Sequence, residues 1–257
     1  MIQVKINLSS IIIAKNEESN IRRCIESQRG CIDEIIVLVD DSTTDKTFEI
    51  AKSYKGVKAH RVIWQGYSAT KKMGISMSSN EWIFWIDADE EITPELSDEL
   101  VKFKESVPAF IAYSIPRKAY FLGKWIKHSG WYPGRVIRLF NKTRVKFNKK
   151  AVHEQLEFTG LAGKFHSNLI HYTDPTIHHY FEKYNVYTSL AAQELLNRGK
   201  KSSIFHILLR PIGIFIKMYL LKAGFLDGIR GFILAVFSSS YVFTKYCKLW
   251  ELEKNKK

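Results

Sequence analysis

Carboxylates follow two apolar segments of the sequence. Residues 34–39 run into Asp40 and Asp41, and residues 81–86 run into Asp87 and Asp89. Two carboxylates that lie two residues apart repel each other unless a cation is close by. A hard divalent ion, held by few protein carboxylates together with substrate phosphates, relieves that repulsion. The pattern therefore predicts metal-assisted chemistry on a phosphate-bearing substrate.

Strand-like and helix-like segments alternate through the first hundred residues. Apolar, β-branched runs predict strands, and runs with one apolar face that begin at polar residues or proline predict helices. The strands are expected at residues 8–13, 34–39, 57–62 and 81–86, and the helices at 16–28, 44–54, 69–78 and 94–104. This order is typical of a doubly wound parallel sheet, whose ligands bind beyond the carboxyl ends of the strands. Glu95 and Asp98 fit the alternative interpretation of helix N-terminal charge.

The pattern changes after residue 108. Residues 111–117 and 136–141 predict two more strands, with antiparallel pairing as one option, and a loop rich in aromatic residues and glycine separates them. Residues 177–199 predict a helix. Residues 203–246 are apolar but interrupted by charges, and their longest uncharged run has 14 residues. That is short of the roughly 20 residues needed to cross a bilayer, so we expect no spanning helix here.

Several motifs resemble those of the family 2 glycosyltransferases, which have the GT-A fold. Ser-Ile-Ile-Ile-Ala-Lys-Asn-Glu-Glu from Ser10, Val-Asp-Asp-Ser-Thr-Thr-Asp-Lys-Thr from Val39 and Asp-Ala-Asp-Glu from Asp87 occur in the family's order and spacing. More narrowly, the chain resembles the lipopolysaccharide core β-1,4-glucosyltransferase group. That likeness rests on Asp-Ala-Asp-Glu and on motifs from Gly134 (Gly-Arg-Val-Ile-Arg-Leu-Phe), Val152 (Val-His-Glu) and Gly224 (Gly-Phe-Leu-Asp-Gly). It covers nearly the whole chain and implies a Rossmann-like, mostly parallel α/β sheet flanked by helices.

The resemblance also implies a reaction and its ligands. Relatives invert the anomeric carbon of a nucleotide-diphospho-sugar and use Mn²⁺ or Mg²⁺, and UDP-glucose is the donor that the narrower group implies. The positions that match nucleotide contacts are Ile13, Ala14, Glu17, Asp40, Lys71, Asp87 and Ala88, and Asp89 matches the metal ligand. Lys46 and Lys72 depart from the pattern of the closer relatives, which bears on the donor more than on the reaction.

An inverting transfer needs a base that takes the proton of the acceptor hydroxyl. Glu154 is our candidate, because it matches the His-Glu of the closer relatives, and the alternative is a surface carboxylate. His153 would orient that base, contact phosphate or complete the metal shell, or else is a structural histidine. The spacings of His166, His171, His178 and His179 fit no standard zinc motif, and a metal role for His171 is the less favoured option.

Aromatic and basic residues gather between residues 125 and 138. Aromatic faces stack on sugars, and arginines bind phosphate or carboxylate. The group therefore predicts contacts to an anionic glycan or glycolipid acceptor, with core packing as the alternative for some of the aromatic rings. The members that we expect to contact acceptor or phosphate are Trp131, Arg135 and Arg138, beside Trp125, His128 and Tyr132.

Charge is distributed unevenly along the chain. Of the net charge of +13, residues 1–100 carry −5, residues 101–198 carry +10, and residues 199–257 carry +8. Basic residues interleaved with apolar runs predict that the last segment lies on an anionic membrane surface, or else packs on protein. We expect no signal peptide, no disulfide from the three cysteines and a cytoplasmic enzyme bound peripherally to the inner face of the membrane.

The expected organisation is a catalytic domain at 1–200, with a nucleotide-sugar half (1–108) and an acceptor half (109–200), followed by a helical segment at 201–257. Three alternatives stay open. One is a glycosyltransferase that acts on another cell-surface glycan or on a protein. A sugar-phosphate nucleotidyltransferase would need a glycine-rich loop after the first strand, which residues 14–19 lack. A non-catalytic nucleic-acid or membrane-binding module fits the basic half, but the strand-end carboxylates oppose phosphate binding without a cation, so we expect no nucleic-acid partner.

Overall fold

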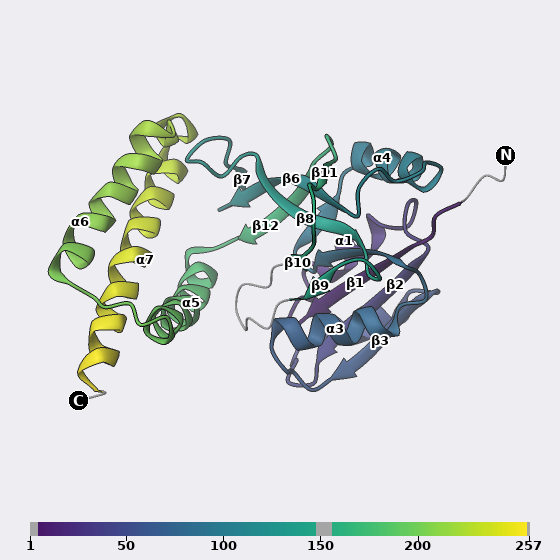
Figure 1. The fold of residues 1–257 in the computed structure, drawn as a ribbon, viewed down its shortest axis with the longest axis horizontal. Coiled ribbons are helices and arrows are strands. Elements are labelled where there is room, and N and C mark those ends of the chain that lie inside the picture. Colours follow the sequence, from purple (N-terminus) through teal and green to yellow (C-terminus); the bar gives the residue numbers. More distant parts are fainter. Residues whose placement is uncertain (1–4, 148–155, 256–257) are drawn as a thin grey trace. The chain divides into compact units, whose positions relative to one another are not determined.

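The computed structural model describes residues 5–147 and 156–255 (Figure 1). The chain divides into two compact units. Unit 1 comprises Met1–Arg117 and Arg135–His171, and unit 2 comprises Lys118–Gly134 and Tyr172–Lys257. Each unit has its own hydrophobic core, and the two are described separately.

Four parallel strands form the first half of the sheet in unit 1. They are β1 (Leu8–Ala14), β2 (Glu34–Asp40), β3 (Val57–Val62) and β4 (Trp82–Asp87), in the order β3-β2-β1-β4. Strands β1 and β2 are apolar and almost entirely buried, as expected for parallel strands with helices on both faces. The predicted alternation is confirmed, and the carboxyl ends of all four strands meet at one edge.

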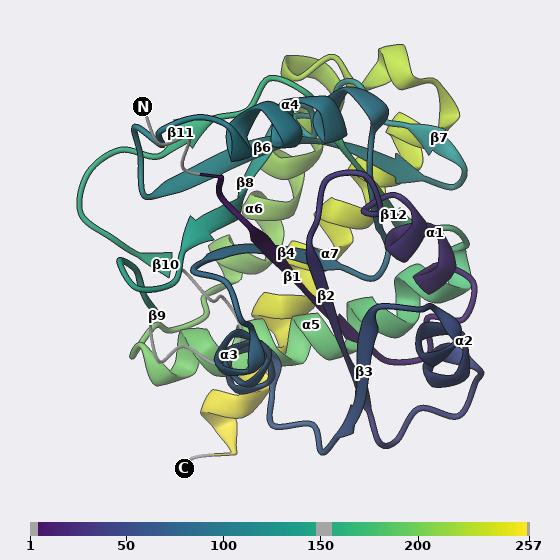
Figure 2. The same cartoon turned by 90° about the vertical axis from the view of Figure 1, so that its right-hand side faces the viewer.

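Side-chain alternation divides the core of unit 1 into two layers. Ile12 and Val37 point into the layer with α1 (Ile21–Glu26), α2 (Thr47–Ser53) and α4 (Pro94–Lys104). Ile11, Ile36 and Leu38 point into the other layer, with α3 (Tyr67–Met77). In Figure 2 the strands are seen nearly edge-on, with α3 on one side and α1 and α2 on the other.

The rest of the sheet is mixed. Strand β8 (Gly134–Asn141) runs antiparallel to β4, so the antiparallel option is the observed one. Beyond it lie β6 (Ala112–Phe121), β12 (Leu169–Asp174) and β5 (Glu90–Ile92), and β5 and β12 pair antiparallel. Short strands complete the described part, namely β7 (Lys124–Trp125) and β11 (Gly163–Lys164) on β6, and the separate pair β9 (Lys146–Phe147) and β10 (Leu156–Glu157). Neither β5 nor β12 was predicted from the sequence.

Unit 2 is mainly helical. It contains α5 (Ile177–Asn197), α6 (Ile204–Phe215), a π-helical turn η1 (Ile216–Leu221), a 3₁₀ turn η2 (Gly224–Asp227) and α7 (Ile229–Lys254). Figure 1 shows α6 and α7 side by side, and the two helices pack along each other. Cys24, Cys31 and Cys247 are free thiols.

Helix α6 continues without a break into η1. Together they span Ile204–Leu221, 18 residues that by length and composition match a membrane-crossing helix. Only 6% of this segment is buried, unlike a helix in a protein core. The count of uncharged runs predicts no spanning helix, whereas the mean over the whole helix meets the length and composition criterion; a peripheral position of this segment stays a prediction. Arg210 and Lys217 leave the mean hydropathy of the continuous helix high.

Candidate active site at the carboxyl edge of the sheet

The loops after β1 and β2 are joined by hydrogen bonds. The Asn16 side chain accepts a hydrogen bond from Thr44 N at 2.9 Å, and Asp45 Oδ2 accepts one from Glu18 N at 2.9 Å. Glu17 N donates to Thr47 Oγ1 at 2.8 Å. Because both loops carry predicted nucleotide contacts, these bonds hold the two halves of that predicted site in one arrangement.

Asp40 ends β2 and is buried. Its Oδ1 accepts hydrogen bonds from the backbone and hydroxyl of Ser42 at 2.9 and 2.8 Å, and Lys15 Nζ lies 3.4 Å from Oδ2. Burial by itself would raise the pKa of Asp40, but these hydrogen bonds and the lysine charge outweigh it and lower the pKa. The carboxylate is therefore ionised and held in a fixed orientation at the strand end.

Asp87 ends β4 and takes part in a buried ion-pair network. Arg138 Nη2 from β8 lies 2.5 Å from Asp87 Oδ2 and 2.5 Å from Glu90 Oε1, and Arg117 Nη1 lies 3.4 Å from the same Glu90 oxygen. Burial would raise the pKa of Asp87, but the charges of Arg138 and Lys71 outweigh it and hold the pKa far below its ordinary value. Arg138, predicted as an acceptor or phosphate contact, thus faces two carboxylates.

Lys71 and the end of β1 lie next to Asp87. Lys71 Nζ is 3.6 Å from Asp87 Oδ1 and 4.8 Å from the ring centre of Trp85. Ile13, near the end of β1, is the register partner of Asp87 on β4. Ala14 and Ala88 are buried beside them, so each can contact a nucleotide through its main chain more readily than through its methyl group. The structure therefore brings the predicted contacts of the first, second and fourth strands to one edge.

His171 lies beside Asp89, a contact that the sequence did not predict. Residues 90–92 form β5, and its antiparallel pairing with β12 places His171 opposite Glu90. His171 Nε2 is 3.4 Å from Asp89 Oδ2, and both side chains are largely buried. Only the histidine spacings in the sequence pointed to this residue, and they favoured no metal role. No cluster of three or more potential metal-ligating residues occurs within residues 5–147 and 156–255.

The remaining predicted residues divide into three groups. Glu17 accepts a hydrogen bond from Asn20 Nδ2 at 2.8 Å at the start of α1. Arg135 Nη1 donates to the carbonyls of Ser114 and Phe165 at 3.2 and 3.1 Å, and Trp131 packs against Phe121 in unit 2. Glu154 and His153 lie outside the described residues, so their roles stay predictions.

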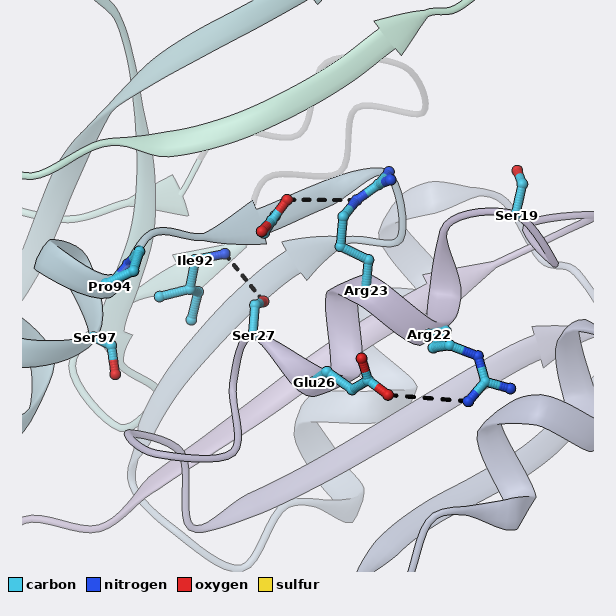
Figure 3. A pocket seen from close by; sticks show the side chains of 9 residues that line it. Ser19, Arg22, Arg23, Glu26, Ser27, Ile92, Pro94 and Ser97 are labelled. Atoms are coloured by element: carbon cyan, nitrogen blue, oxygen red, sulfur yellow. Dashed lines mark hydrogen bonds and ion pairs between the residues drawn. The ribbon is translucent and has the colours of Figure 1, made fainter.

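A cavity of about 430 Å³ lies beside α1, away from these residues (Figure 3). Its two arginines face carboxylates, since Arg22 lies 3.9 Å from Glu26 and Arg23 lies 3.5 Å from Glu91. Within the described part of the chain, none of the predicted nucleotide or metal contacts lines this cavity. We therefore place the candidate site at the strand ends.

Comparisons with known proteins identify the family of the chain. The family model "Glycosyl transferase family 2" matches residues 9–169. An uncharacterized glycosyltransferase of Rickettsia typhi is 32% identical over 256 residues, which cover 95% of this chain and 87% of the relative. The lipopolysaccharide core biosynthesis glycosyltransferase LpsC of Rhizobium meliloti is 26% identical over 96% of this chain and 93% of its own.

Among solved structures, Staphylococcus aureus TarS 1–349 in complex with UDP is 12% identical, covers 98% of this chain and 92% of its own, and has a TM-score of 0.43. The family match reaches from β1 to the first residue of β12 and includes Asp40, Asp87 and Asp89, whereas His171 lies just beyond it. Most of the chain is thus matched by one enzyme family, and the chain belongs to glycosyl transferase family 2 and is a glycosyltransferase.

Proposed function

We propose that this glycosyltransferase transfers glucose from UDP-glucose, with inversion and with the help of a divalent metal ion, to a heptose of the lipopolysaccharide inner core or to a similar anionic glycan. The main support for this proposal is the cluster of charged side chains at the end of β4, where Asp89 lies 3.4 Å from His171 and Asp87 lies 3.6 Å from Lys71. The match to LpsC over 96% of the chain supports the acceptor class.

Asp89 and His171 fit a metal ion that is shared with a substrate. They offer one oxygen and one nitrogen donor, and Mn²⁺ or Mg²⁺ in such sites takes its remaining ligands from phosphates and water. A divalent ion bound there neutralises charge on the departing diphosphate. Lys71, which is 14% exposed, adds a positive charge beside Asp87. Its ammonium group is placed to stabilise that negative charge.

Arg138 acts in this proposal by positioning Asp87. Its guanidinium bonds both Asp87 and Glu90, which fixes the last carboxylate of β4 at the edge where the ribose is expected. Asp40, bonded by Ser42, is expected to contact the nucleoside from β2. The main chain of Ile13 and Ala14 completes the nucleotide site.

Glu154 is proposed as the base that accepts the proton of the acceptor hydroxyl, with His153 beside it in the sequence. Trp131 and Arg135 are proposed acceptor contacts. In this scheme residues 1–108 bind the donor, residues 109–200 bind the acceptor, and residues 201–257 hold the enzyme on the cytoplasmic face of an anionic membrane. A glycan of another kind or a protein acceptor would leave the donor chemistry unchanged.

The donor and the metal are tested by calorimetry. UDP-glucose, UDP-galactose, UDP-N-acetylglucosamine and GDP-mannose are titrated with Mn²⁺ and then with EDTA into the wild type, Asp89→Ala and Asp98→Ala. Asp98 is an exposed aspartate on α4 and serves as the matched control. We expect UDP-glucose to bind only with the metal, and this binding to be lost in Asp89→Ala and kept in Asp98→Ala.

Three outcomes would count against the proposal. Equal binding in EDTA would show that no metal ion is needed for donor binding. Binding of another nucleotide sugar would show that UDP-glucose is not the donor. Salt-dependent oligonucleotide binding that survives Asp89→Ala, without any nucleotide-sugar binding, would favour the non-catalytic alternative. For the base, Glu154→Gln should keep donor binding while the rate of transfer falls by about 100-fold or more.

A further inference from the structure

The motif Gly-Phe-Leu-Asp-Gly at residues 224–228 builds a tightly packed turn in unit 2. A Cβ atom on Gly224 would lie 2.6 Å from Ser129 Oγ and 2.7 Å from the Met218 carbonyl oxygen. A Cβ atom on Gly231, in the first turn of α7, would lie 1.9 Å from the Gly224 carbonyl oxygen. No side chain fits at either position, so the turn lies directly on the start of α7.

Asp227 fastens this turn to the loop at residues 127–129. The carboxylate is 3% exposed and accepts hydrogen bonds from Lys127 N at 3.1 Å and His128 N at 2.9 Å. Its Oδ1 also lies 3.1 Å from His128 Nδ1, and Ser129 N donates to the Lys222 carbonyl at 2.9 Å. The turn and the loop therefore form one rigid structure within unit 2.

The apolar residues of the same turn point outward. Phe225 is 49% exposed and Leu226 is 60% exposed, although the aspartate next to them is buried. We call the outer apolar surface the set of exposed residues that extends from α6 through this turn: Phe205, Leu208, Leu209, Ile212, Ile216, Leu220, Leu221, Phe225, Leu226 and Ile229. Exposed apolar surface on this scale marks a contact with protein or membrane.

A basic cavity of about 550 Å³ lies in unit 2, and two of its lysines, Lys217 and Lys222, directly follow Ile216 and Leu221 of the outer apolar surface in the sequence. Lys127, Lys217 and Lys222 line it, together with Trp131 and Tyr132, and its lining contains no carboxylate. Among the residues that the structure describes, Lys217 and Lys222 form no ion pair. Ser129 also lines the cavity, and its hydroxyl is buried without a hydrogen-bond partner among the described residues.

These groups match the chemistry of a phosphate ester. Ammonium groups and a hydroxyl donor bind phosphate oxygens, and an unpartnered buried hydroxyl gains a bond when such an oxygen arrives. An apolar surface beside a basic cavity fits a molecule whose anionic head is joined to acyl chains. Another protein chain would not need the lysine charges to adjoin the apolar residues in this way.

We propose that unit 2 inserts the outer apolar surface, with Phe225 and Leu226 at its turn, into an anionic bilayer, and that the cavity of Lys127, Lys217, Lys222 and Ser129 receives the phosphate of an anionic phospholipid. The inference deepens the membrane association proposed above and rests on it. In this arrangement the Gly-Phe-Leu-Asp-Gly motif has two roles: it presents apolar residues to lipid, and it anchors the phosphate-binding loop.

The test is flotation of the full chain with vesicles of phosphatidylcholine alone or mixed with phosphatidylglycerol. The double variant Phe225→Ser/Leu226→Ser removes apolar contacts, and Lys217→Gln/Lys222→Gln removes cavity charge. Val107→Ser/Leu161→Ser is the matched control, because Val107 and Leu161 are exposed apolar residues of unit 1, 89% and 81% exposed. Thermal melting of each variant checks that it is folded.

We expect the wild type to prefer the phosphatidylglycerol vesicles. The Phe225/Leu226 variant should lose about 100-fold or more in affinity for both kinds of vesicle. The Lys217/Lys222 variant should lose about 30-fold for the anionic vesicles alone. Ser129→Ala should also weaken binding to the anionic vesicles, measured in competition with inorganic phosphate at constant ionic strength. The control should bind like the wild type.

Three results would overturn the inference. If the Lys217/Lys222 variant keeps the lipid preference, the cavity does not bind the headgroup. If the Phe225/Leu226 variant binds like the wild type, membrane association stands but uses another surface. If the wild type binds no vesicles and light scattering shows a dimer that Phe225→Ser/Leu226→Ser dissociates, a second copy covers the surface. Nucleotide-sugar calorimetry judges the transferase proposal separately from all three.

Discussion

Glu34 and Arg138 show how buried charges connect distant segments of this chain. Glu34 begins β2 and bonds Lys58 Nζ at 2.6 Å, Ser9 Oγ at 2.5 Å and Ser79 N at 2.8 Å. Arg138 occupies the corresponding role at the carboxyl edge, between Asp87 and Glu90. In both cases a charged group ties together segments that are distant in the sequence, and its removal should affect stability before chemistry.

Arg138→Met should destabilise unit 1 by about 2–4 kcal/mol, because the buried Glu90 and the half-buried Asp87 lose their shared cation and keep the more distant Arg117 and Lys71. Urea unfolding measures the loss. Arg144→Met, at an exposed arginine of the same unit, should change the free energy of unfolding little. Adding Glu90→Gln to Arg138→Met should recover part of the loss, and a loss that the double variant does not reduce would contradict the account.

The stability of unit 1 should depend on pH through Glu34. Burial would raise the pKa of Glu34, but hydrogen bonds from Lys58, Ser9 and Ser79 outweigh it and lower the pKa from 4.5 to about 2. A carboxyl whose pKa is lowered by folding stabilises the folded state fully above pH 4.5, and that contribution is lost as the pH falls from 4.5 towards 2.

The measurement is urea unfolding of the wild type and Glu34→Gln at several pH values. The difference between their free energies of unfolding should be largest at neutral pH and should shrink below pH 4.5. Glu105→Gln, at an exposed carboxyl, is the control and should track the wild type throughout. A difference for Glu34→Gln that stays constant with pH would contradict the prediction.

At the scale of elements, helix α3 carries Lys71 to the site by lying close against the sheet. Gly74 makes this approach possible, since a Cβ there would be 2.5 Å from Ile11 Cγ2 and 3.2 Å from Leu38 Cδ1. The helix and strands β1 and β2 are therefore in direct contact beneath the site. Lys71 lies one turn before Gly74, so the distance from Lys71 to Asp87 depends on this packing.

Gly74→Ala should lower the free energy of unfolding by about 1–3 kcal/mol, because the added methyl group displaces α3 from the sheet. It should also weaken nucleotide-sugar binding by moving Lys71. Gly213→Ala is the opposite case, since no atom lies within 4 Å of a Cβ at that position in α6. Alanine there should stabilise the chain by about 0.5–1 kcal/mol. Thermal and urea unfolding separate the two, and a neutral Gly74→Ala would refute the close-packing argument.

At the scale of the whole molecule, the two compact units have separate cores. Leu234 on α7 is fully buried with Phe121 and Ile126 in one core of unit 2, and the core of unit 1 contains none of these residues. Two segments that flank residues 135–171 of unit 1 in the sequence thus supply the packing of unit 2. The stability of unit 2 requires both the loop at residues 118–134 and the C-terminal helices.

Leu234→Ala should cost about 2–5 kcal/mol and should increase amide hydrogen exchange in α7 and around Phe121, while exchange in β1 and β2 stays unchanged. Val236→Ala, at a position 37% exposed on the same helix, is the matched control and should have a small effect. Faster exchange in β1 and β2 of the Leu234 variant would show that the units unfold together.

The sequence by itself determined the parallel half of the sheet and the positions of its carboxylates. Strands β1 to β4 are short apolar runs separated by helical segments, and the carboxyl ends of parallel strands necessarily share an edge. Asp40, Asp87 and Asp89 could therefore be placed at the site from local pattern alone. The motif order was sufficient to predict the family.

Only the tertiary structure decided which residues meet these carboxylates. His171 reaches Asp89 through the pairing of β5 with β12, and Arg138 reaches Asp87 from β8. Strand β5 has three residues, too few to show a period, and antiparallel pairing between distant segments leaves no local signal in either one. In unit 2 the composition showed that residues 203–246 are apolar, but packing decided which of them face solvent, because α7 covers one side of α6 and the outer apolar surface stays open.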